Sequence, residues 1–166
     1  KSDQLGELTL GLITLPFYRS QAYYDQAAWR GTWALDGGGI LMNQGIHQID
    51  LLTWFMGDPV EILAVAGTLQ REIEVEDTVS ACLRFENGAL AVINGTTTAL
   101  PGFPPRIEVY GTRGGIQLEG ETPLRWTIDG EDRLPGELVP DQPSGAAGAR
   151  QSLLSDLRQP GAGGGR

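Results

Sequence analysis

The chain has 166 residues, of which 40% are hydrophobic and 20% charged, and it carries a formal net charge of −9. This length fits one domain, or one domain with a tail, and the apolar fraction suffices for a core. The negative charge argues against binding to nucleic acid or to anionic membrane surfaces, which require basic patches. No apolar stretch is long enough to span a membrane and no signal peptide opens the chain, so we expect a cytoplasmic protein.

The N-terminal part predicts a strand followed by an irregular, aromatic-rich segment. Residues 6–19 alternate loosely between apolar and polar side chains and contain Pro16, which favours an opening strand. Residues 20–35 show no period. Within them, Trp29, Arg30 and Trp33 fit two interpretations equally, aromatic packing beside a surface arginine or contact with a ligand.

Residues 40–56 predict one long helix, bounded by the glycines 37–39 before it and by Gly57-Asp58-Pro59 after it. A turn of about 100° per residue places four side chains on one narrow polar stripe, while the rest of the surface is apolar and predicts a mostly buried helix. The stripe consists of Asn43, His47, Asp50 and Trp54. Gly45 lies beside it and costs about 1 kcal/mol against alanine. Its presence indicates that another group packs against the backbone there.

His47 is the only histidine in the chain. Because imidazole titrates near neutral pH, it is a common general acid or base. Asn43, one turn earlier, would hold a hydroxyl or carbonyl oxygen beside it. Two other interpretations stay open, a hydrogen-bonded core histidine and a metal ligand, although His47 and Asp50 alone do not complete a metal site. The glycines 37–39 lack the spacing of a dinucleotide fingerprint, but the helix start after them would suit an anionic group.

From Val60 onward the hydrophobic period changes to two, which predicts strands at 61–69, 78–85, 89–98, 106–110, 116–119 and 123–129. Short connections, including the hairpin turn Asn87-Gly88, predict an antiparallel sheet of about six strands. Cys82 lies in one of these apolar runs, and we expect its thiol to be buried. One helix covers one face of such a sheet, so the fold class is α+β and the open face predicts a homo-oligomer.

The domain is expected to occupy residues 1–130. Residues 131–166 have a low-complexity composition, with a possible short helix at 151–159. No internal repeat is visible.

The run from Tyr23 to Gly57 resembles the C-terminal domain of the glucose–fructose oxidoreductase/inositol dehydrogenase/rhizopine catabolism (Gfo/Idh/MocA) family. The triple glycine, a polar residue at 43, Gly45, His47 and Asp50 stand where that family has them. The resemblance implies an NAD(P)-dependent oxidoreductase acting on a sugar or cyclitol. An N-terminal Rossmann domain outside this chain would bind NAD or NADP and supply a catalytic lysine.

The same resemblance implies residue roles. His47 and Asn43 would be catalytic, Trp29, Arg30 and Gln44 would bind substrate, and Asp50 would support them, with no metal. Position 43 is Asn where other branches have Asp, so proton movement would depend on His47 and the lysine. The fragment alone would be inactive. The alternative is a non-enzymatic sugar-binding or dimerisation module with the same fold.

Overall fold

The computed structural model describes residues 4–133. The helices are α1 (Gln21–Asp25), α2 (Ile40–Asn43) and α3 (Ile46–Met56). The strands are β1 (Leu8–Pro16), β2 (Pro59–Gly67), β3 (Thr78–Phe85), β4 (Leu90–Thr96), β5 (Arg106–Gly111), β6 (Gly114–Glu119), β7 (Thr122–Ile128) and β8 (Glu131–Asp132). The predicted tail was residues 131–166, and its first residues form β8. The rest of it, from residue 134 on and including the possible helix at 151–159, lies outside the described residues.

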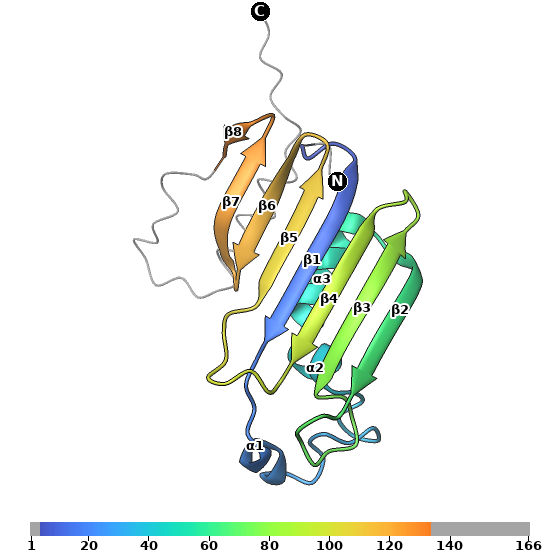
Figure 1. Ribbon diagram of the computed structural model, residues 1–166, viewed down its shortest axis with the longest axis vertical. Coiled ribbons are helices and arrows are strands. Elements are labelled where there is room, and N and C mark those ends of the chain that lie inside the picture. The colour runs from blue at the N-terminus through green and yellow to red at the C-terminus, as the bar shows by residue number, and fades with distance from the viewer. Residues whose placement is uncertain (1–3, 134–166) are drawn as a thin grey trace, which may run out of the picture.

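The strands form one mixed sheet in the order β2-β3-β4-β1-β5-β6-β7-β8 (Figure 1). The α+β prediction is confirmed, but the prediction of about six strands is wrong, because the sheet has eight strands within residues 4–133. The opening strand β1 inserts between β4 and β5, where it runs parallel to β4 and antiparallel to β5. The turn at Asp129 and Gly130, both with positive φ, returns the chain as the short strand β8.

The prediction of one long helix over residues 40–56 is also wrong, because the helix is broken between α2 and α3. A Cβ atom on Gly45 would lie 2.5 Å from Leu15 Cδ1 of β1. The side chain of Leu15 is fully buried, so the space beside the Gly45 Cα is filled and leaves no room for a larger residue. The inference that another group packs against Gly45 is therefore confirmed.

Helix α3 packs on the sheet with its chain direction antiparallel to β1. Gly45, before the start of α3, lies beside Leu15 at the end of β1, and Gly11 near the start of β1 faces Leu52 and Met56. Figure 1 shows α2 and α3 on the far side of the sheet, behind its central strands. The core lies between them and the sheet. Its largest fully buried members are Phe85, Leu5, Ile13, Leu15, Ile40, Leu52, Ile116 and Val109. The helix is less buried than predicted, since only Leu52 and Phe55 of α3 are buried.

The face of the sheet opposite the helices is uncovered by any described element (Figure 1). Strand β3 places Val79, Ala81, Leu83 and Phe85 in the core. Its alternation turns Cys82 toward the other face, so the expected buried thiol is instead exposed. Within residues 4–133, no helix combines the length and the apolar composition needed to cross a membrane.

Candidate functional site

The predicted catalytic residues lie around the break between the two helices. Asn43 is the last residue of α2, Gln44 lies in the break, and His47 is in the first turn of α3. The side chains of Asn43 and His47 are both exposed. The His47 ring therefore faces solvent, outside the packed core, and it makes no hydrogen bond to another described residue. Because the helix is broken between them, the spacing of one regular helical turn no longer positions this pair.

A carboxylate joins Asn43 to the loop that precedes α2. Asn43 Nδ2 donates a hydrogen bond of 2.5 Å to Asp36 Oδ1. The backbone N–H of Gly31 donates to Asp36 Oδ2 at 2.8 Å. The two oxygens of Asp36 thus bring Gly31, next to the predicted substrate residue Arg30, close to Asn43.

The guanidinium of Arg30 lies between aromatic rings. Its Cζ is 4.1 Å from the ring centre of Tyr23 and 4.9 Å from that of Trp29, distances typical of cation–π contacts. Arg19 also lies over the Tyr23 ring, at 5.3 Å. Arg30 Nε is buried and has no hydrogen-bond partner among the described residues. Neither arginine forms an ion pair within residues 4–133, so the cluster has unused capacity for an anionic group.

The start of α2 already holds a carboxylate from the protein itself. Glu76 Oε2 accepts a hydrogen bond from the N–H of Gly39 at 3.0 Å, and Glu76 Oε1 accepts one from the N–H of Leu41 at 3.4 Å. A Cβ on Gly39 would lie 1.8 Å from the Glu76 carbonyl oxygen. The expectation that this helix start binds an external anion is therefore wrong, because Glu76 takes that place.

The carboxylate of Asp77 holds the backbone of the loop that carries Glu76. The backbone N–H groups of Leu69, Gln70 and Arg71 donate to its carboxylate at 2.9, 2.8 and 2.9 Å. Burial raises the pKa of Asp77, but these bonds and one from the Thr78 hydroxyl outweigh burial and leave the pKa below its usual value.

The same loop carries Glu74, whose carboxylate accepts the N–H of Trp33 at 3.1 Å. Sequence reasoning missed Asp36, Glu74, Glu76 and Asp77. The acidic run at 72–77 was visible only as a charged connection, because nothing in it indicates a partner some forty positions earlier.

Asp50 is exposed on α3, one turn after His47. No group of three or more potential metal ligands gathers within residues 4–133.

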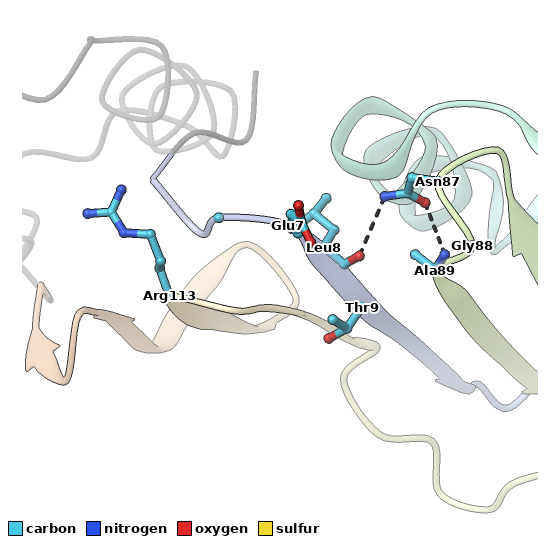
Figure 2. Close-up of a pocket in the computed structure, with 8 residues that line it drawn as sticks. Glu7, Leu8, Thr9, Asn87, Gly88, Ala89 and Arg113 are labelled. Atoms are coloured by element: carbon cyan, nitrogen blue, oxygen red, sulfur yellow. Dashed lines mark hydrogen bonds between the residues drawn. The ribbon is translucent and has the colours of Figure 1, made fainter.

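A cavity of about 750 Å³ lies at the other end of the sheet (Figure 2). It is lined by the start of β1, by the turn between β3 and β4 and by Arg113 of the turn between β5 and β6. None of the predicted site residues lines this cavity. Arg113 is paired with Asp129 through two hydrogen bonds.

The described residues do not fit a dinucleotide cofactor. A dinucleotide site needs a strand that leads through a glycine-rich turn into a helix whose N–H groups remain free for phosphate. Here α2 has only four residues, and the N–H groups at its start bond to Glu76.

Sequence comparison finds relatives among oxidoreductases. Myo-inositol 2-dehydrogenase of Thermotoga maritima is 35% identical over 103 residues, covering 58% of this chain and 31% of that protein. The uncharacterized oxidoreductase YrbE of Bacillus subtilis is 36% identical over 100 residues, covering 57% of this chain and 29% of that protein. The chain thus spans less than a third of the length of either relative.

Among solved structures, the WlbA dehydrogenase of Bordetella pertussis in complex with NADH and UDP-GlcNAcA superposes with a TM-score of 0.73. It is 35% identical, over 76% of this chain and 39% of that one. Levoglucosan dehydrogenase in complex with NADH and levoglucosan has a TM-score of 0.63 and 25% identity, over 71% of this chain and 34% of that one.

The model of the GFO/IDH/MocA C-terminal domain matches residues 1–117, which include β1 to β5, the three helices and the Asp36–Asn43 contact. On this match, and on the shared fold of the NADH-bound dehydrogenases, the chain belongs to the GFO/IDH/MocA C-terminal domain family.

Proposed function

We propose that this chain is the substrate-binding and catalytic domain of an NAD(P)-dependent oxidoreductase that acts on a hydroxyl or carbonyl group of a sugar or cyclitol. The observation that carries the proposal is the exposed pair Asn43 and His47 at the helix break, within a chain that belongs to this family. The inositol and levoglucosan dehydrogenases among the relatives support the substrate class.

His47 is the proposed general acid or base, and Asn43 orients the reacting oxygen. An exposed imidazole without a hydrogen-bond partner among residues 4–133 can donate to, or accept from, a substrate oxygen. Gln44, in the break beside Asn43, contacts the substrate, and Asp50 supports the helix from the next turn.

The cofactor is proposed to bind to a domain outside this chain, because the described residues do not fit it. Relatives solved with NADH support a nicotinamide cofactor, and NAD and NADP are equally compatible with this proposal. The fragment by itself should therefore show no turnover.

Arg30 and Trp29 are proposed to bind an anionic part of the substrate. The Arg30 guanidinium is stacked on Tyr23 and Trp29, it has no acidic partner among residues 4–133, and its Nε is buried without a hydrogen bond. A carboxylate or phosphate would satisfy these donors. The neighbour solved with UDP-GlcNAcA, which bears both groups, is consistent with this assignment.

The uncovered sheet face is proposed to pair with a second copy of the chain. A cytoplasmic location is proposed as well, from the acidic composition together with the described residues, which include no helix able to span a membrane.

The test is a substrate panel on the full-length protein. Neutral sugars, inositols and sugar acids are offered with NAD⁺ and NADP⁺, and reduction is followed by absorbance. His47→Ala should lower kcat by about 10²–10⁴, the usual contribution of general acid–base catalysis. His47→Gln keeps a hydrogen-bonding group without titration, so it separates proton transfer from simple hydrogen bonding.

Asp58→Asn serves as the control, because Asp58 is exposed in the turn after α3, at the far end from His47. An unchanged kcat in His47→Ala would remove His47 from the mechanism. Tight sugar binding without turnover on any substrate would favour the non-enzymatic alternative.

A further inference from the structure

The side chains of Asp36 and Asn43 meet where the loop before α2 approaches the end of that helix. Asp36 uses one oxygen for Asn43 Nδ2, at 2.5 Å, and the other for the backbone N–H of Gly31, at 2.8 Å. One carboxylate therefore ties a fixed backbone donor to the side chain that is proposed to orient the substrate.

The contact determines which end of the Asn43 amide faces Asp36. An ionised carboxylate only accepts hydrogen bonds, whereas an amide donates through its NH₂ group and accepts through its oxygen. Asn43 must therefore turn its NH₂ group toward Asp36. Its Oδ1 atom is left without a hydrogen-bond partner among the described residues, on an exposed side chain.

We propose that Asp36 is a positioning residue that holds the Asn43 amide with its oxygen outward, as a fixed acceptor for a hydroxyl group of the substrate. This inference rests on the function proposed above. A freely rotating amide would present donor and acceptor in turn, and ordering it at binding would cost affinity. With Asp36 in place the polarity is set in advance, so the site selects ligands that donate at this point.

Asp36→Asn reverses this polarity with little change in shape. The new side chain has one acceptor oxygen, which the immobile Gly31 N–H engages, and its NH₂ group then faces Asn43. Asn43 has to turn its own oxygen inward and its NH₂ outward. In the full-length protein, we expect kcat/KM to fall by about tenfold or more, the loss typical of a misplaced hydrogen bond.

The exchange variant Asp36→Asn/Asn43→Asp separates positioning from a general structural role. There the NH₂ group at position 36 donates to a carboxylate at position 43, whose second oxygen faces outward as an acceptor. We expect this variant to recover most of the lost kcat/KM. The single variant Asn43→Asp should itself have a reduced kcat/KM, because two carboxylates would then be in contact. Asp58→Asn should match the wild type.

Wild-type kcat/KM in Asp36→Asn, or an exchange variant no better than Asp36→Asn, would overturn the proposal. If the full-length protein reduces no cofactor with any sugar or cyclitol, the proposed function fails separately. The contact is then judged by the melting temperatures of Asp36→Ala, Asn43→Ala and the double variant. A double variant less destabilised than the two single effects combined supports the link, and additive shifts reject it.

Discussion

Asp77 is a fully buried acid without a cationic partner within 4 Å among the described residues. Such a charge is tolerated only when hydrogen bonds replace its hydration. Three backbone N–H groups and the Thr78 hydroxyl do so here, and the net result is a lowered pKa. The residue thereby shapes the loop whose Glu74 and Glu76 hold Trp33 and the start of α2.

Asp77→Asn should destabilise the full-length protein by about 1.5–3 kcal/mol at pH 7, because hydrogen bonds to a charged acceptor are lost. A carboxyl whose pKa is lowered by folding stabilises the protein above its unfolded pKa, near 3.9, and loses that contribution as the pH falls through the lower folded value. The free-energy difference between variant and wild type should therefore be constant above about pH 5 and shrink below pH 4.

Denaturant unfolding between pH 7 and pH 3 measures this difference. Glu86→Gln, at an exposed turn position, is the control and should follow the wild type throughout. A difference that grows on acidification would contradict the assignment.

At the scale of elements, strand β1 approaches the break between α2 and α3 closely enough to require glycine there. Alanine at position 45 would favour a helix by about 1 kcal/mol over glycine. That gain is opposed by Leu15, whose Cδ1 would lie 2.5 Å from the new Cβ and whose side chain is only 1% exposed. A buried side chain has no free space into which to move, so overpacking should prevail.

Gly45→Ala is accordingly expected to destabilise the protein by about 1–3 kcal/mol. In a Leu15→Ala background the clash is absent, and the same substitution should be neutral or stabilising. Thermal unfolding of the four variants of this cycle measures both effects. Equal costs in the two backgrounds would show that Leu15 is not what excludes a larger residue at position 45.

At the scale of the whole molecule, the uncovered sheet face carries a continuous apolar row across four adjacent strands. The row follows the pairing register from Leu63 to Cys82, then to Val92 and Leu12. Leu63 is 69% exposed although it belongs to a regular strand of the sheet. An exposed apolar row of this kind is typical of a face that another subunit covers.

Leu63→Lys should therefore shift the full-length protein toward a smaller species, as measured by size-exclusion chromatography with light scattering. Ile62→Lys is a matched control on the same strand, since Ile62 is 58% exposed but points to the helix side of the sheet. We expect Ile62→Lys to keep the wild-type size. A monomeric wild type, or equal effects of both variants, would contradict pairing through this face.

Much of this architecture follows from local patterns. The strands from Val60 to Ile128 follow the period of two, and Asn87-Gly88 gave the hairpin that the structure contains. The pattern was less informative for the helix, because an apolar helix surface does not show where the helix is interrupted. Likewise, the apolar composition of β3 suggested that Cys82 is buried, whereas the alternation of the strand turns its side chain to the exposed face.

The sequence by itself determined the fold class, the positions of most strands and the family resemblance carried by Gly37–Gly39, Asn43 and His47, because these depend on composition and on short-range spacing. Only the tertiary structure decided that β1 lies at the centre of the sheet, that Glu76 occupies the start of α2, and that Asp36 joins Gly31 to Asn43. Those contacts join segments whose separation in the chain carries no periodic signal, and they form only when packing brings the segments together.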